Sequence, residues 1–425
     1  MKILQVNTFD DYGGAAKAAY RIHRALVEEG VESCMRVLEK TKQDNTVFSD
    51  SSSIINSKIA RKIYYRLNSF NPHLWRWHTD NNSLHTFGNI SSGLTDEFNI
   101  CNADVLNLHW ISNMLSVKDI GMLRKPLIWT FHDMWPFCGG EHYSSDLPSA
   151  RFRQGYRSDN RPSLERGPDL NRKTWNLKKT WWRNQHFDIV CPSRWLAQCA
   201  RESVLFSDAN IHIIPYAIET DKVWKPISRE IARMKLGITS KKKIILFGAL
   251  GGTKNQIKGA DLLKAAIEEV IGQQDNSIEL AIFGQDGRSS ENTWPCPVYW
   301  LGEVKDEHAL AIAYSAADVM VVPSRQDNLP NTAIEAQACG IPVVAFKIGG
   351  LPDIITHSQT GWLAQPFDAS EMAFGIQWVL EDENRWNSLS ELSRKNVLTK
   401  FSPQIIAQQY SKLYEMVIQN HASSK

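Results

Sequence analysis

The chain has 425 residues, of which 43% are hydrophobic and 22% are charged, and its formal net charge is +2. Single cores stop growing near ~250 residues, so this length predicts two domains. The balanced charge and the absence of a long run of like charges argue against nucleic acid as a partner.

The first residues are apolar for only a short stretch, which ends at Asn7 and Asp10. We therefore expect neither a signal peptide nor a spanning helix, and a cytoplasmic location. The seven cysteines form an odd number without Cys-x-x-Cys spacing. This pattern predicts reduced, buried thiols rather than a disulfide framework or a zinc site.

In the first half of the chain, short apolar strands alternate with longer helical patterns. The predicted strands are 2–6, 105–108, 127–131 and 189–191, and a helix is predicted at 15–29. This alternation is typical of a parallel sheet with helices on both faces. The turn Gly13-Gly14 after the first strand lacks the Gly-x-Gly-x-x-Gly pattern, which disfavours a nicotinamide-dependent dehydrogenase.

Two segments interrupt this first domain. Residues 51–79 contain no acidic residue, and their basic part, 58–77, alternates with aliphatic and aromatic residues. This part is either a solvated helix with its apolar side on the core or a surface for anionic lipid headgroups. Residues 144–183 carry ten Lys or Arg, and an acceptor-binding, a lipid-facing and a flexible role all remain open.

Polar and aromatic residues follow two strands of the first domain. His109-Trp110 comes after 105–108, and His132 ends the strand 127–131, followed by Trp135 and Tyr143. A side chain at a strand end emerges at the edge of the sheet, so these residues are candidates for ligand binding. A packing role is equally open for Trp135 and Tyr143.

The alternation restarts in the second half, with strands predicted at 243–247, 279–283, 319–322 and 342–346. The segment 213–229 connects the halves, and we place the boundary near Thr220. The expected domains are 1–220 and 221–400, followed by a C-terminal helix at 401–425. Ser402 is the expected cap of that helix and Pro403 its first residue.

Two loops of the second domain carry the clearest chemical signals. Small residues from Gly248 onward let the backbone approach a ligand, and Lys258 places a cation before a helix. In the other loop, Asp327 and Glu335 stand eight residues apart, around a helix start at Asn331-Thr332. Carboxylates accept hydrogen bonds from hydroxyl groups; alternatively, Asp327 caps the turn and Glu335 pairs with a base.

The segment around Asp327 and Glu335 resembles the acid-x7-acid motif of the retaining family-four (group 1) glycosyltransferases of GT-B fold. Residues 132–140 resemble the His-Asp-Met-Trp-Pro-Phe-x-Gly-Gly stretch of bacterial members, which include enzymes of surface polysaccharides such as O-antigen, capsule or exopolysaccharide. The chain departs from the family pattern at two positions: Asp327 replaces the usual Glu, and Ala249 stands where Arg is common.

The resemblance implies an α/β protein of two Rossmann-like domains that face each other across a cleft, with a C-terminal helix that crosses back to the first domain. It implies metal-independent transfer, with retention, from a UDP- or GDP-linked sugar to a glycan or a lipid-linked oligosaccharide. No cofactor is expected. The basic segment 58–77 is then a candidate contact with the cytoplasmic face of the inner membrane.

The resemblance also assigns roles to the candidate residues. The catalytic set is His132 beside the transferred sugar, Asp327 on sugar hydroxyls and Glu335 on the ribose. The expected donor-binding residues are Gly13, Gly14, Gly248, Lys258, Asn328, Leu329, Pro330, Asn331, Thr332 and Glu335. The acceptor-side candidates are His109, Trp110, Trp135 and Tyr143. A sugar-nucleotide epimerase of the same fold and an inactive donor-binding scaffold, suggested by Ala249, remain the alternatives.

Overall fold

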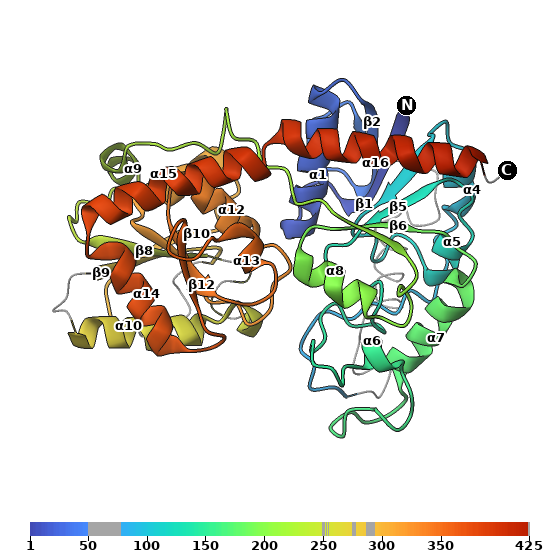
Figure 1. Ribbon diagram of the computed structural model, residues 1–425, viewed down its shortest axis with the longest axis horizontal. Helices are drawn as coiled ribbons and strands as arrows, with labels where there is room; N and C mark the ends of the chain where they lie inside the picture. Colours follow the sequence, from blue (N-terminus) through green and yellow to red (C-terminus); the bar gives the residue numbers. More distant parts are fainter. Residues whose placement is uncertain are drawn as a thin grey trace. The chain divides into compact units, whose positions relative to one another are not determined.

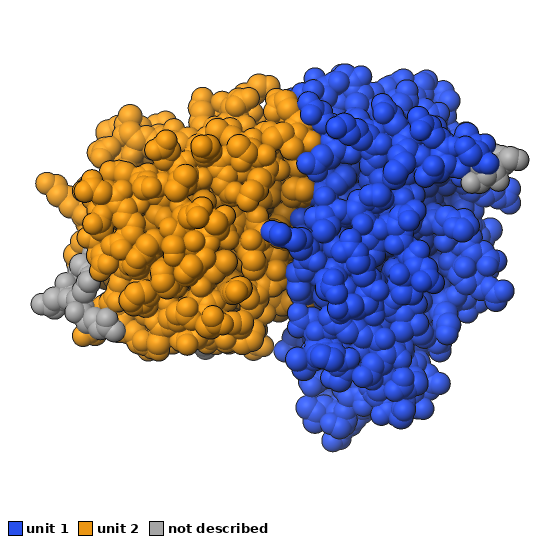
Figure 2. Space-filling model, in the orientation of Figure 1, with its two compact units in different colours: residues 1–214, 407–425 blue, residues 215–406 orange. Residues whose placement is uncertain are grey.

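The computed structural model describes residues 1–49, 78–248, 251, 253, 255–273, 278–285 and 294–423. The chain forms two compact units (Figure 1; Figure 2). Unit 1 consists of Met1–Ile214 and Ala407–Lys425, and unit 2 of Pro215–Ile406. Each unit has its own parallel sheet and its own hydrophobic core.

Unit 1 contains a seven-stranded sheet in the order β3-β2-β1-β4-β5-β6-β7, and all neighbouring strands are parallel. Its strands are β1 (Lys2–Phe9), β2 (Glu32–Glu39), β3 (Val47–Phe48), β4 (Val105–Leu108), β5 (Leu127–Thr130), β6 (Asp188–Cys191) and β7 (Asn210–Ile213). Its helices are α1 (Gly13–Glu28), α4 (Thr95–Ile100), α5 (Val117–Gly121), α6 (Arg151–Gln154), α7 (Leu170–Trp182) and α8 (Arg194–Arg201). Strands β4 and β5 are buried along their whole length, as expected in a parallel sheet with both faces covered.

Unit 2 contains a six-stranded parallel sheet in the order β10-β9-β8-β11-β12-β13. Its strands are β8 (Lys243–Gly248), β9 (Ile278–Phe283), β10 (Val298–Gly302), β11 (Val319–Val322), β12 (Val343–Phe346) and β13 (Gly361–Ala364). Its helices are α9 (Arg229–Lys235), the 3₁₀ turn η3 (Gln256–Lys258), α10 (Ala260–Gln273), α11 (Glu307–Ala316), α12 (Asn331–Ala338), α13 (Leu351–Ile354), α14 (Ala369–Leu380) and α15 (Glu383–Lys400). The two-sheet α/β architecture is the predicted one.

The last helix, α16 (Pro403–Ser423), begins in unit 2 and continues in unit 1 from Ala407. Its ribbon lies along unit 1 (Figure 1). Its Tyr414 accepts hydrogen bonds from Gln5 of β1 and Asn107 of β4, and its Tyr410 hydroxyl lies 3.1 Å from that of Thr130 in β5. The C-terminal helix therefore returns to the unit formed by the first half of the chain. Among the described residues, no helix is both long and apolar enough to cross a lipid bilayer.

Polar side chains explain where several helices begin. Ser193 accepts a hydrogen bond from the backbone of the first turn of α8, Asp306 does so for α11 and Asp368 for α14. These bonds satisfy backbone N–H groups that have no partner inside the helix.

The segment 144–183 packs against the core of unit 1. Phe152, Trp175 and Trp182 belong to that core, and Arg151 pairs with Asp169 at 2.7 Å. A flexible insertion, one of the roles left open by the sequence, is wrong here because the aromatic residues of the segment are buried. The basic segment 58–77 lies outside the described residues.

The order of the strands reverses once in each sheet. In unit 1 this point lies between β1 and β4, and in unit 2 between β8 and β11. Loops that leave the carboxyl ends of such a strand pair run to opposite sides, which opens a crevice where ligands of α/β proteins bind. The loops that carry Gly13, His109, Lys258 and Asp327 all leave these four strands.

All seven cysteines lie in the described part of the chain, and none forms a disulfide. Five of them are buried, Cys101 is partly buried and Cys34 is exposed. The expected burial is confirmed for these five cysteines, and Cys34 is the exception.

Candidate active site

Two loops of unit 2 touch each other at the reversal point of the sheet. Lys258 is the last residue of η3, and Gly259 follows with a positive φ of 69°. A Cβ atom on Gly259 would lie 1.9 Å from the carbonyl oxygen of Pro323. The backbone N–H of Arg325 donates to the carbonyl of Ile257 at 2.7 Å. Glycine therefore allows the loop after β8 to lie directly on the loop after β11.

This contact brings Lys258 and Asp327 together. Lys258 Nζ lies 2.5 Å from Asp327 Oδ2, with the side chains 29% and 9% exposed. Ser324 Oγ lies 3.4 Å from the same oxygen, and the backbone N–H of Gly350 donates to the carbonyl of Asp327 at 3.2 Å. The sequence assigned this cation and this carboxylate to different parts of a ligand, and the structure pairs them.

Glu335 lies in α12 and is buried. The hydroxyl of Tyr314 donates to its Oε2 at 3.0 Å, and the Tyr314 ring packs edge-on against Phe283. Phe283 in turn occupies the space beside Gly248, where a Cβ atom would lie 2.2 Å from its ring. Packing against Phe283 therefore requires glycine at position 248. Tyr314, which sequence reasoning missed, orients the carboxylate that was predicted to bind a ribose.

The remaining predicted donor residues form the start of α12. Asn328, Leu329 and Pro330 are buried in the loop, where Asn328 Nδ2 donates to the hydroxyl of Tyr216 at 3.4 Å. Asn331 and Thr332 begin the helix and are partly exposed. Backbone N–H groups at a helix start attract anions, so this position suits a phosphate.

In unit 1, the ends of β4 and β5 place two imidazoles in contact. His109 Nδ1 lies 3.0 Å from His132 Nε2. Burial lowers the pKa of His132 to about 4. Burial, and then the charges of His132 and His23, also hold the pKa of His109 well below its ordinary value. Both rings are therefore uncharged at neutral pH.

Asp133 accepts hydrogen bonds on both carboxylate oxygens. His142 Nδ1 lies 2.6 Å and Trp110 Nε1 2.9 Å from its Oδ2, while the backbone N–H of Trp135 donates to Oδ1 at 2.9 Å. Burial raises the pKa of Asp133, but His142 and these hydrogen bonds outweigh it and lower the pKa. His142, which sequence reasoning missed, therefore helps to hold Asp133 ionised.

The aromatic acceptor-side candidates differ in their surroundings. Trp110 is partly exposed, and Phe9 stacks on it with ring centroids 6.1 Å apart. Trp135 is only 2% exposed, and its Nε1 donates to the carbonyl of Thr86 at 2.7 Å. A sugar-stacking role for Trp135 is therefore wrong, because its ring lies inside the core. Tyr143 is partly buried against the same core.

The glycine turn after β1 forms the start of α1. Gly13 has a positive φ of 85°, and no atom lies within 4 Å of the place where a Cβ atom would stand. Gly14 is exposed. The backbone conformation rather than crowding requires glycine at position 13.

Two family models match the chain. Residues 12–222 match the model described as Glycosyltransferase Family 4, and residues 241–382 match Glycosyl transferases group 1. The chain belongs to glycosyltransferase family 4, group 1.

Individual relatives agree with this family. D-inositol 3-phosphate glycosyltransferase of Corynebacterium aurimucosum is 30% identical over 236 residues, which cover 51% of this chain and 55% of the relative. The matched part of the chain thus spans about half the length of that curated relative.

Two solved structures share the fold over their whole lengths. Sucrose-phosphate synthase from Thermosynechococcus elongatus has a TM-score of 0.70 at 18% identity, with 99% of this chain and 100% of that chain covered. Anabaena HepE, solved with UDP and glucose, has a TM-score of 0.62 at 15% identity, with 98% and 99% covered. These similarities confirm the GT-B fold predicted from the sequence.

One departure from the family pattern concerns the cations near the donor loops. Ala249 and Lys254 lie outside the described residues. Arg325, a cation in the loop after β11, forms two hydrogen bonds of 2.8 and 2.6 Å with Asp261. The guanidinium group of Arg325 is thus paired with a carboxylate near the surface, and its side chain is 38% exposed, compared with 29% for Lys258.

Lys178 of α7 is a further residue that sequence reasoning missed. Its ammonium group donates to the carbonyls of Trp135, Cys138 at 3.0 Å and Gly139 at 2.7 Å. Burial lowers its pKa to about 7. This side chain anchors the His-Asp-Met-Trp-Pro-Phe-x-Gly-Gly stretch of the family to α7.

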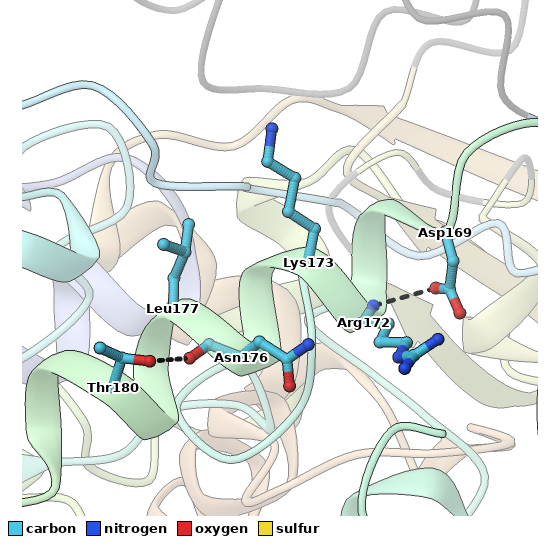
Figure 3. Close-up of a pocket in the computed structure, with 6 residues that line it drawn as sticks. All are labelled: Asp169, Arg172, Lys173, Asn176, Leu177 and Thr180. Carbon is cyan, nitrogen blue, oxygen red and sulfur yellow. Dashed lines mark hydrogen bonds between the residues drawn. The ribbon is translucent and has the colours of Figure 1, made fainter. Parts of the chain in front are cut away.

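The other face of α7 carries an open groove (Figure 3). Lys173 and Leu177 project from it on the same side, while Asp169 accepts from the backbone N–H of Arg172 and Thr180 donates to the backbone carbonyl of Asn176 (Figure 3). The described residues that line it include none of the candidate site residues. The groove is therefore not formed by these candidate residues.

Proposed function

We propose that the protein transfers a sugar from a nucleotide sugar to a hydroxyl acceptor, with the donor bound to unit 2. The observation that carries this proposal is the contact of the two loops at the reversal point of the second sheet. It places the Lys258 cation, the Asp327 carboxylate and the start of α12 at one edge. A cation and a helix start suit a diphosphate, and carboxylates suit hydroxyl groups.

The donor is a UDP- or GDP-linked sugar. HepE, which shares the fold, was solved with UDP and glucose, and this supports UDP as the first candidate. Thermal unfolding of the purified protein with a panel of UDP- and GDP-sugars tests which donor binds. A ligand that binds the folded state raises the midpoint temperature of unfolding. A panel without any shift would contradict a donor site.

We propose retention of the anomeric configuration. An inverting enzyme needs a carboxylate or another base to deprotonate the acceptor. Asp133 lies next to His132, but its two oxygens already accept three hydrogen bonds, which supports a structural role for it. We expect an α-linked product from an α-linked donor, measured by the anomeric coupling in NMR of the fresh product. A β-linkage would overturn this assignment.

The transfer is proposed to be independent of metal ions. Lys258 supplies a positive charge for the diphosphate that leaves with the nucleotide. Activity after treatment with EDTA is therefore expected to equal that of the untreated protein. Activity that is lost and then restored by manganese or magnesium would contradict this expectation.

Two classes of acceptor are candidates. The motif at 132–140 favours a glycan or lipid-linked oligosaccharide of a bacterial surface polysaccharide. The names of the relatives, an inositol 3-phosphate glycosyltransferase and a sucrose-phosphate synthase, favour a small phosphorylated polyol or sugar. Incubation of donor with both acceptor classes, followed by mass spectrometry, distinguishes them. An isomerised donor would instead indicate an epimerase, and no product with a bound donor would indicate a scaffold.

A further inference from the structure

The loop after β12 fixes the backbone of Asp327 within unit 2. The N–H of Gly350 donates to the Asp327 carbonyl oxygen at 3.2 Å, and a Cβ atom on Gly349 would lie 1.9 Å from the same oxygen. The Asp327 side chain is 9% exposed, and Ser324 Oγ lies 3.4 Å from its Oδ2. This carboxylate therefore has a fixed place and little contact with water.

Lys258 reaches this carboxylate from the loop after β8. Its Nζ lies 2.5 Å from Asp327 Oδ2, and its side chain is 29% exposed. Within the described part of the chain, Nζ forms no other hydrogen bond or ion pair. An ammonium group has three N–H donors. Lys258 can therefore bind a phosphate oxygen while it remains paired with Asp327.

A phosphate oxygen bound to Lys258 must lie close to Asp327. A hydrogen bond between an ammonium group and a phosphate spans about 2.8 Å, so the phosphate oxygen and Asp327 Oδ2 lie within about 5–6 Å of each other. Negative charges at this distance repel, and the repulsion is stronger where little water separates them. Lys258 attracts a diphosphate, and Asp327 opposes each additional negative charge on it.

The donor and the product of a sugar transfer differ in this charge. Transfer breaks the bond between the anomeric carbon and a phosphate oxygen, which keeps the electron pair, and the acceptor hydroxyl loses its proton. A free terminal phosphate loses its second proton near about pH 6. The released nucleoside diphosphate is therefore more negative than the donor at neutral pH, and it lacks the sugar hydroxyls that donate hydrogen bonds to a carboxylate.

We propose that Asp327 makes the donor site discriminate against the free nucleoside diphosphate and so promotes its release after transfer. This inference rests on the proposed function, in which Lys258 binds the diphosphate and Asp327 the sugar hydroxyls. Both residues belong to unit 2. Asp327 thus reduces the affinity for the product more than the affinity for the donor, because only the donor offers hydroxyl groups to its carboxylate.

The test removes the charge of Asp327. Asp327→Asn keeps the shape of the side chain and an oxygen that accepts from Lys258, and Asp327→Ser is a second neutral variant in case the first does not fold. Asp327→Glu keeps the charge. Asp261→Asn is the control, because Asp261 also pairs with a cation, Arg325 at 2.6 Å, but is 66% exposed. Thermal unfolding checks that each variant is folded.

The readout is the affinity for UDP, GDP, UDP-glucose and GDP-glucose, measured by calorimetry in buffer with EDTA at pH 7.5. Loss of the charge is expected to raise the affinity for the free diphosphate about tenfold. The affinity for the matching glucose nucleotide should change less than about twofold, because the variant also loses an acceptor for sugar hydroxyls. In Asp327→Glu and Asp261→Asn, all affinities should stay within about twofold of those of the natural protein.

Three results would overturn the proposal. They are an unchanged or lower diphosphate affinity in the neutral variants, an equal gain for the diphosphate and its glucose nucleotide, and an equal gain in Asp261→Asn. In each case the proposed donor site still stands, because the ligands bind. If neither the natural protein nor any variant binds any of the four ligands, the donor site fails and this inference fails with it.

Discussion

The ion pair of Lys258 and Asp327 joins the two residues with the strongest claims to contact the donor. The carboxylate is nearly buried, whereas the ammonium group is 29% exposed. The cation therefore remains accessible to a ligand while Asp327 holds its position. A nucleotide diphosphate that approaches Lys258 then meets an oriented charge rather than a mobile one, which reduces the reorganisation needed on binding.

Lys258→Ala is expected to lower kcat/KM for transfer about 100-fold, because it removes a charge that stabilises the leaving diphosphate. Lys264→Ala is the matched control, since Lys264 lies in the neighbouring helix α10. Steady-state kinetics with varied donor, together with donor binding by calorimetry, measures both effects. Equal donor affinity in Lys258→Ala and the natural protein would remove Lys258 from the site.

His23 provides a residue-scale prediction for pH. It is buried between Ser33 Oγ at 2.9 Å and Thr46 Oγ1 at 2.8 Å, and burial lowers its pKa from the ordinary 6.5 to about 4. Between these two pKa values the unfolded chain binds a proton that the folded chain does not. Stability therefore falls as the pH decreases from 6.5 to 4.

This difference corresponds to about 2 kcal/mol of stability lost between pH 8 and pH 5. His23→Gln is expected to reduce the pH dependence of unit 1 unfolding by about this amount, and His186→Gln, at an exposed position, to leave it unchanged. Urea unfolding of each variant at pH 8 and at pH 5 measures this change in the free energy of unfolding. The same pH dependence in His23→Gln and the natural protein would show that burial does not keep His23 neutral.

At the scale of elements, strands made of continuous apolar residues were predictable. Strands β4 and β11 have the bounds expected from Val105–Leu108 and Val319–Val322. Strand β2 was missed because it contains Arg36, a fully buried charge that pairs with Glu97 at 2.7 Å. No local pattern reveals a charged residue whose partner comes from a different part of the chain.

The residues of the candidate site also include some that were predictable from the sequence and some that were not. Lys258, Glu335 and His132 were predictable from motifs, since each stands in a recognisable loop or strand end. Tyr314, His142, Lys178 and Tyr414 were not, because their roles arise from contacts with residues distant in the chain. Sequence patterns identify the candidate ligand-binding residues more readily than the residues that contact and orient them.

The contact between the loops after β8 and β11 yields an element-scale prediction. Gly259→Ala adds a Cβ atom 1.9 Å from Pro323 O at a residue with φ of 69°. The two loops must separate, so Lys258 moves away from Asp327, and donor affinity is expected to fall at least about tenfold. Gly272→Ala in α10 is the control, because no atom lies within 4 Å of its Cβ position. Unchanged donor affinity in Gly259→Ala would show that this loop contact does not shape the site.

At the scale of the whole molecule, the two units have separate cores but share one helix. The core cluster of unit 1 and that of unit 2 have no residue in common. Helix α16 begins with residues of unit 2 and buries Tyr410, Leu413, Tyr414 and Val417 in unit 1. The last part of the chain is therefore needed to complete the unit formed by the first part.

Truncation after Ile406 is expected to unfold unit 1 and to preserve unit 2. Removal of a buried aromatic side chain costs about 3–5 kcal/mol, and the loss of Tyr410, Leu413 and Tyr414 together approaches the whole stability of a domain, about 5–15 kcal/mol. Differential scanning calorimetry should show the transition of unit 2 alone. A chain that ends at Gln419 is the control, because it keeps these side chains and should retain both transitions. Two unchanged transitions after truncation at Ile406 would show that the sheet of unit 1 is stable without α16.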